Sequence, residues 1–299
     1  MNMPSTSPRT EMALIAFCAL LFCMTPAVTL ADPGPAMPSS ESSQEADFPW
    51  ISEELYYSVR INGTEAMRAG LRTGTIRQRE GHAYIPINGM ARSRGFFNAV
   101  YPLDDRANTF LNPRDFRPLR SEKVFEEAGK KRSYFVDYRH NSFEAQVERT
   151  RENRTTQFNS PIPGRTHDMM TWIYDLRRAG TLSMGDQFSF YIYDGWLVSR
   201  LDLEVVGQED LLTPMGWFKT WKLTFSREIM DVRRNRSNSD DDDDAEAIPP
   251  DVSLREAARH SGHIWFSRDE NLLPVRVTIS TMLGSGEAVL IRYQPGEGR

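Results

Sequence analysis

Cysteine is almost absent from this chain of 299 residues, which contains only Cys18 and Cys23. Both lie in an apolar stretch near the N-terminus that we expect to be removed. The remaining chain would then contain no cysteine, which excludes disulfides, thiolate metal sites and a cysteine nucleophile. Burial of apolar side chains must therefore supply the stability of the fold.

The sequence also lacks the motifs of common catalytic sites. It contains no G-x-S-x-G elbow, no Walker loop and no Rossmann fingerprint. Of the five histidines, only His260 and His263 lie close together, and no HExxH motif or cysteine pair completes a zinc set. Asp269 and Glu270 are adjacent, so their side chains are expected to point apart and to make a poor acid/base pair. We expect no catalytic residue, no metal and no cofactor.

An excess of positive charge is missing as well. The formal net charge is −5, from 36 basic and 41 acidic residues. No basic patch with interleaved aromatic residues is present, which argues against nucleic acid as a partner. The mild acidity also disfavours charge-driven binding to anionic membrane surfaces.

The N-terminus is typical of a secretory signal. An apolar run from Ala13 to Met24 is followed by small Thr29 and Ala31, at the positions that a signal peptidase requires. We predict a cleaved signal peptide over residues 1–31 and a location in the periplasm or cell envelope. An uncleaved anchor is the alternative, but Pro26 interrupts the run, which is shorter than the about 20 residues of a membrane span.

The chain after the signal divides by composition. Residues 32–49 are rich in proline, serine and acidic residues and are predicted to form a flexible linker. Residues 50–295 are predicted to form a single β-rich domain. Within it, residues 231–258 carry an arginine cluster, five consecutive aspartates at 240–244 and a Pro-Pro pair. This stretch is predicted to be a solvated, disordered insertion between strands ending near Arg227 and starting near His263.

Deleting Ser237 to Ala247 is expected to change thermal stability little. Solvated residues bury little surface, and shortening a loop alters its closure entropy by about 1 kcal/mol or less. Thermal melts of the intact and deleted proteins, each titrated with calcium, test this prediction. A calcium-dependent rise in melting temperature that only the intact protein shows would instead mean that the aspartates form an ordered site.

Strand patterns dominate the predicted domain. Residues 55–61 and 64–76 flank an Asn-Gly hairpin signal, and residues 188–205 alternate apolar and polar side chains on both sides of Asp194-Gly195. Two polar stretches are harder to interpret. Residues 91–120, with three prolines, predict two short edge strands, and residues 149–167 predict an irregular approach to a helix.

One segment, Asp168 to Gly180, has a helical pattern. Asp168 suits the N-cap better than a role as partner of His167 in proton transfer, and Gly180 can end the helix. Apolar residues recur at three- and four-residue spacing: Met169, Trp172, Ile173 and Leu176. The predicted fold is mainly β, with one large, strongly curved antiparallel sheet, like a half-barrel, packed around this single amphipathic helix.

The sequence resembles a bacterial family, domain-of-unknown-function family 3108. The resemblance covers roughly residues 50–295 and rests on an ordered set of segments: Glu54-Leu55-Tyr56-Tyr57 with Ala69-Gly70, Asp168 to Arg177, Trp196, Gly207-Gln208-Glu209, and Trp265 to Asp269 leading to Leu273-Pro274-Val275. It implies a secreted envelope protein of β-rich fold without an assigned chemistry. The acidic insertion departs from the family pattern.

Aromatic residues are the remaining candidates for binding. On a concave sheet they would line a groove for an apolar chain, although they could equally fill a large core. The candidates are Trp172, Trp196, Trp217, Trp221, Tyr191 and Tyr193. The even spacing of Trp217 and Trp221 predicts that both face the core.

Two functions are compatible with these features. The first is a non-enzymatic cell-envelope protein that binds an apolar or amphipathic ligand, such as a lipid or lipoprotein segment, in the concave sheet. The alternative is a structural or assembly protein whose sheet edges contact another envelope protein.

Overall fold

The computed structural model describes residues 48–151, 154–234, 248–281 and 284–297. The predicted signal peptide, most of the predicted linker and the five aspartates lie outside these residues. In chain order the elements are β1 (Glu54–Ile61), β2 (Thr64–Thr73), β3 (Arg77–Arg79), β4 (His82–Ser93), α2 (Gly95–Val100), β5 (Leu103–Leu111), β6 (Pro118–Glu127), β7 (Lys130–Arg139), the 3-10 turn η1 (His140–Ser142), β8 (Glu144–Arg151), β9 (Arg154–Pro161), β10 (Thr166–His167), α3 (Thr171–Arg177), β11 (Gln187–Tyr193), β12 (Val198–Thr213), β13 (Gly216–Arg233), β14 (Asp251–Ser267), β15 (Pro274–Thr281) and β16 (Gly284–Gln294).

All the described strands belong to one sheet. Its order is β10-β11-β12-β13-β14-β15-β16-β1-β2-β4-β5-β6-β7-β8-β9, and β3 pairs with β4 outside this path. Neighbouring strands are antiparallel except β10 and β11, which run parallel. The predicted large antiparallel sheet is therefore confirmed.

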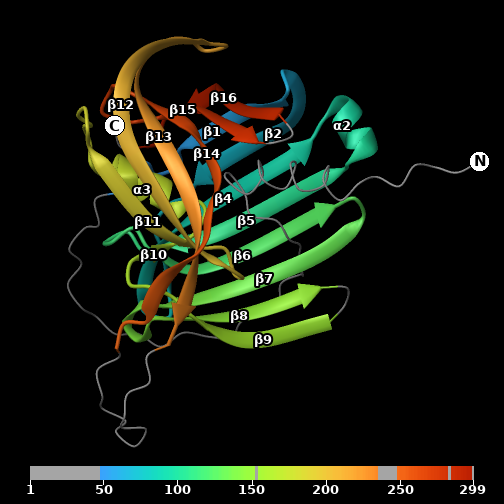
Figure 1. The fold of residues 1–299 in the computed structure, drawn as a ribbon, viewed down its shortest axis with the longest axis vertical. Helices are drawn as coiled ribbons and strands as arrows, with labels where there is room; N and C mark the ends of the chain where they lie inside the picture. The colour runs from blue at the N-terminus through green and yellow to red at the C-terminus, as the bar shows by residue number, and fades with distance from the viewer. Residues whose placement is uncertain (1–47, 152–153, 235–247, 282–283, 298–299) are drawn as a thin grey trace, which may run out of the picture.

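The sheet curves until its two halves face each other. In Figure 1, β12, β13 and β14 run across the half that β4 to β9 form. Side chains of β7 and β8, including Val136 and Val147, pack in one apolar cluster with Val198 and Met230 of β12 and β13. The turn at Gly195 comes close to β7: a Cβ there would lie 3.0 Å from a ring carbon of Tyr134, and its φ of +94° also favours glycine.

A larger core lies inside the curve and contains α3. Six of the seven α3 residues are buried, so the helix is enclosed on more than one side and acts as a plug. It is shorter than predicted, because it covers Thr171–Arg177, and its N-cap is Met170 rather than the predicted Asp168. Asp168 Oδ1 accepts the backbone N–H groups of Met170 and Thr171, at 3.0 and 2.9 Å, and Gly180 adopts a left-handed φ of +72° just beyond the helix.

The prediction of two edge strands within residues 91–120 is wrong. β5 and β6 are long strands in the interior of the sheet order, and α2 precedes them. The prolines do not interrupt the ladders, because Pro102 precedes β5 and Pro118 is the first residue of β6. Buried and more exposed residues alternate along β5, but the buried ones include Asp105 and Thr109. The sequence therefore does not show this alternation as an apolar pattern.

Residues 149–167 also form more strand than predicted, because most of them belong to the hairpin of β8 and β9. β9 is the last strand in the sheet order and is mostly exposed, so it lacks an apolar face. The insertion is narrower than predicted: residues 231–233 and 251–258 lie in β13 and β14. The core begins earlier than predicted, since Phe48 is buried against Trp50 and Phe116.

Candidate functional site

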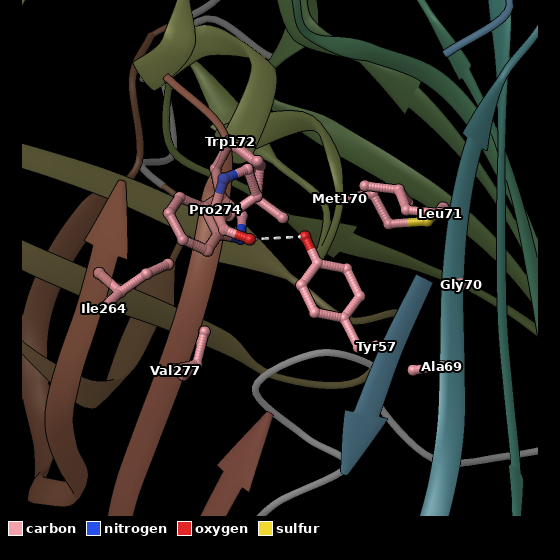
Figure 2. Close-up of a pocket in the computed structure, with 10 residues that line it drawn as sticks. Tyr57, Ala69, Gly70, Leu71, Met170, Trp172, Ile264, Pro274 and Val277 are labelled. Carbon is pink, nitrogen blue, oxygen red and sulfur yellow. Dashed lines mark hydrogen bonds between the residues drawn. The ribbon is translucent and has the colours of Figure 1, made fainter. Parts of the chain in front are cut away.

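An apolar cavity of about 30 Å³ separates α3 from the inner face of the sheet. Figure 2 shows Trp172 beside Pro274 and Met170 beside Leu71, with the ring of Tyr57 between them. The lining residues come from β1, β2, β14, β15 and the α3 segment: Tyr57, Ala69, Gly70, Leu71, Met170, Trp172, Ile173, Ile264, Pro274 and Val277. The cavity thus joins parts of the chain that are more than two hundred residues apart.

The polar side chain of this lining, Tyr57, is already satisfied. Its hydroxyl donates a hydrogen bond of 2.8 Å to the carbonyl oxygen of Pro274 (Figure 2). Burial raises the pKa of Tyr57 far above its usual value, so the hydroxyl stays neutral. The lining therefore offers neither charge nor a free hydrogen-bonding group, and it favours an apolar occupant over a polar one.

The cavity is small for a ligand. A cavity of about 10–15 Å³ is just large enough to hold one water molecule, and an apolar cavity of about 150 Å³ holds a benzene. A hydrocarbon chain must therefore displace some of the lining. Met170, which is 2% exposed, is suited to this because its unbranched side chain repacks more easily than the surrounding aliphatic groups.

A buried ion pair holds α3 over the cavity. Two nitrogens of Arg177 donate to the two carboxylate oxygens of Glu53, each at 2.6 Å, and both side chains are fully buried. Arg177 Nε also donates to the Asn271 carbonyl at 2.9 Å. The guanidinium lies 4.4 Å from the ring centre of Trp50. This pair could not be recognised from the sequence, because an arginine in the last turn of a helix is normally solvated.

The six aromatic candidates occupy several different environments. Trp172 lines the cavity, whereas Tyr193 and Tyr191 belong to the cluster between β7–β8 and β11–β13. Trp196 is exposed at the turn after β11, where Arg149 lies 4.4 Å from its ring centre. Trp221 packs at the edge of the larger core. Trp217 is 72% exposed, so the prediction that it faces the core is wrong. Ligand binding by these residues stays a prediction.

The histidines were the other candidates for metal binding or proton transfer. Among the described residues, no cluster of three or more histidine, cysteine, aspartate or glutamate side chains could hold a metal. His167 is 1% exposed, and its Nε2 lies 3.2 Å from an oxygen of Asp175 rather than pairing with Asp168. Asp168 instead accepts a hydrogen bond from the hydroxyl of Thr109.

Two buried carboxyl groups face the interior from β5 and β6. Asp105 and Glu127 are 0% and 1% exposed, and each has one oxygen without a hydrogen-bond partner among the described residues. Burial, and then the charge of Glu127, raises the pKa of Asp105 to about 8. Burial likewise raises the pKa of Glu127 to about 7, although Arg132 lies 3.0 Å from it and opposes the shift. Sequence reasoning missed both groups: Asp105 lies within residues 91–120, which were expected to form edge strands, and Glu127 lies beyond that stretch.

No helix in the described ranges combines the length and the apolar character that crossing a membrane requires.

Comparisons with known proteins identify one family. A sequence model described as "Protein of unknown function (DUF3108)" matches residues 56–291. No curated protein is detectably similar to the chain.

Three solved structures are similar over most of their length. A beta-barrel-like protein of domain of unknown function DUF1849 from Brucella abortus has 10% identity and a TM-score of 0.48, covering 84% of this chain and 100% of that one. A protein inferred to be exported, with a YmcC-like fold, from Bacteroides fragilis NCTC 9343 has 12% identity and a TM-score of 0.34. The match covers 83% of this chain and 98% of that one. A protein inferred to be a lipoprotein, from Parabacteroides distasonis ATCC 8503, has 11% identity and a TM-score of 0.33. The match covers 83% of this chain and 97% of that one.

Proposed function

Because the chain belongs to the DUF3108 family, whose function is unknown, we propose a role from the site itself: a non-enzymatic cell-envelope protein that binds the hydrocarbon part of a lipid or lipoprotein segment beside α3. The observation that carries this proposal is the apolar cavity, whose tyrosine hydroxyl is already bonded within the protein. The signal-like N-terminus supports the location. Fractionation of cells that produce the full chain tests it, and recovery of the protein in the cytoplasm would contradict it.

A hydrocarbon chain can occupy the cavity by taking the place of the Met170 side chain. A chain that replaces the side chain of Met170 would contact Trp172 and the aliphatic side chains of β14 and β15 without meeting an unsatisfied polar group. Each buried methylene contributes about 0.8 kcal/mol, so even a partly inserted chain gains substantial affinity. The buried Glu53–Arg177 pair keeps α3 in place while the smaller groups move.

Cavity variants are expected to change binding of a fluorescent long-chain fatty acid in opposite directions. Met170→Ala enlarges the cavity and should strengthen binding, whereas Ala69→Leu fills it and should weaken binding about tenfold or more. Fluorescence titration gives both affinities. Ala145→Leu is the matched control, because Ala145 is also buried but lies in the smaller core, away from the cavity.

Absence of bound lipid would contradict the proposal. Native mass spectrometry after gentle purification should show the intact protein with bound lipid. If no lipid is retained, and if Met170→Ala and Ala69→Leu both bind the fatty acid with the affinity of the unmodified protein, the cavity is only a packing defect.

A second role is favoured by the position of β9 at the edge of the sheet that the described residues form. This strand pairs with β8 and is the last strand of the sheet order, so a further strand could add to its other side. Crosslinking in cells separates the two roles. A photoreactive group at Gln157 should capture one envelope protein reproducibly if the edge is used, and no protein if the chain acts only as a lipid binder.

A further inference from the structure

A second pocket, of about 480 Å³, opens on the outer face of the sheet across β1, β2, β4, β5 and β6. Its volume lies within the range of about 300–1,000 Å³ that is usual for ligand sites. Its side chains alternate with the buried side chains of the same strands, as Asn88 and Met90 alternate with Ile87 and Ala91. It therefore lies on the opposite face of the sheet from the cavity beside α3, although Gly70 and Leu71 of β2 border both.

The strand register places planar polar groups in a row across this pocket. Arg72 pairs with Asn88, Asn88 with Asn108, and Asn108 with Glu122. Four adjacent strands thus contribute one guanidinium, two amides and one carboxylate at the same level. The two asparagines are short beside the longer side chains around them, and this difference in length hollows the face.

The charges of the pocket are largely compensated within the protein. Asp104 forms ion pairs with both Arg92 and Arg106. Arg72 Nε lies 3.2 Å from an oxygen of Glu54. The lining has three arginines and two carboxylates. An anion would have to compete with these carboxylates for the guanidinium groups, so the pocket is better matched to an uncharged polar ligand.

One hydrogen-bonding group in the pocket is unsatisfied. Asn108 Oδ1 is a buried atom without a hydrogen-bond partner in the part of the chain that the structure describes. A buried polar atom of this kind calls for a partner. The atom is closed off from solvent, so a ligand hydroxyl can donate to it only when neighbouring side chains shift.

The pocket also has an apolar side. Tyr56 and Met90 lie on either side of Gly70, where an added Cβ would be 3.2 Å from Met90 Cγ and 3.3 Å from the Tyr56 ring. Arg292 lies 4.4 Å from the centre of the same ring. A ligand in this pocket would meet C–H and aromatic surface at one end and amide, guanidinium and carboxylate groups at the other.

From this combination we infer that the outer pocket binds a carbohydrate. A sugar ring carries adjacent hydroxyl groups, which pair with the donors and acceptors of planar amide, guanidinium and carboxylate groups. It also has apolar C–H faces, which pack on tyrosine and methionine side chains. No charge is needed on the ligand, in agreement with the internal pairing of Arg92 and Arg106 with Asp104.

The test is a titration of the isotope-labelled protein followed by NMR, with maltotetraose and chitotetraose as the sugar probes. We expect at least one sugar to shift the amide signals of Asn88, Met90 and Asn108. Asn108→Leu should weaken that binding about tenfold, because the amide hydrogen bonds are lost. Asn159→Leu is the matched control on exposed β9 and should leave the affinity unchanged.

Inorganic phosphate and laurate are the competing probes. Phosphate that shifts the same signals with higher affinity than either sugar would identify an anion site and overturn the inference. Laurate should not displace the sugar, because the cavity beside α3 lies on the opposite face of the sheet. If neither sugar binds up to its solubility limit, or if Asn108→Leu binds as tightly as the unmodified protein, the pocket is not a carbohydrate site.

Discussion

Asp105→Asn is expected to make the protein more stable than the unmodified chain at alkaline pH, while the two differ little in acid. Asp105 is fully buried on β5, where one carboxylate oxygen accepts the Glu126 N–H at 3.3 Å and the other has no partner among the described residues. Ionising this group in the folded state is costly, because it leaves water and lies near the charge of Glu127.

The direction of the pH dependence follows from the pKa values. The pKa of Asp105 is about 8 in the folded protein, against about 3.9 in the unfolded chain. The folded state thus binds the proton more tightly, so its stability is greatest below pH of about 4 and falls until about pH 8. A pKa shift of about 4 units corresponds to at most about 6 kcal/mol of stability, which the asparagine would restore.

Urea unfolding over a series of pH values measures this effect. Asp104→Asn is the matched control, because Asp104 is the next residue but lies on the outer face. Burial alone would raise the pKa of Asp104, but its hydrogen bonds to Arg106 and Arg92 outweigh burial and lower it. The control should therefore lose stability, mainly at neutral pH. Parallel curves for Asp105→Asn and the unmodified protein between pH of about 4 and 8 would contradict the assignment.

The parts of the fold that could be predicted from sequence are those whose buried face is apolar. The hairpins of β1–β2 and β11–β12 carry clear alternation and a turn signal, and both were predicted. β5 could not be recognised in the same way, because Asp105 and Thr109 are buried where apolar residues were expected. β9 has no buried face to detect, since its position in the sheet depends on pairing with β8.

The candidate sites were harder to predict, because they depend on strand register. Trp172 was a candidate for binding and does line the cavity. Its neighbours Ala69 and Val277 are ordinary small residues, and only the order β14-β15-β16-β1-β2 brings them together. The outer pocket likewise depends on the pairing of Asn88 with Asn108, and neither residue is unusual in sequence.

Glu53→Gln is expected to destabilise the protein by about 3–5 kcal/mol at neutral pH, because it leaves the buried charge of Arg177 without a counter-charge. The pair connects α3 with the segment before β1, and Arg177 also bonds to the Asn271 carbonyl in the segment before β15. α3 contributes Trp172 and Ile173 to the cavity lining, and the other two segments lead into β1 and β15, which also line it. Loss of the pair should therefore loosen α3 and speed hydrogen exchange of its amides, in addition to lowering the free energy of unfolding.

The double variant Glu53→Gln/Arg177→Met distinguishes a charge penalty from lost packing. If the uncompensated charge causes the loss, removing it should restore much of the stability, since an apolar replacement of a buried pair is often neutral or better. The Arg120–Asp137 pair is the matched control: it is also bidentate, at 2.6 and 2.8 Å, but partly exposed. Asp137→Asn should cost no more than about 1 kcal/mol. Equal losses from Glu53→Gln and Asp137→Asn would mean that the buried pair does not hold α3, because desolvation is the physical difference between the two sites.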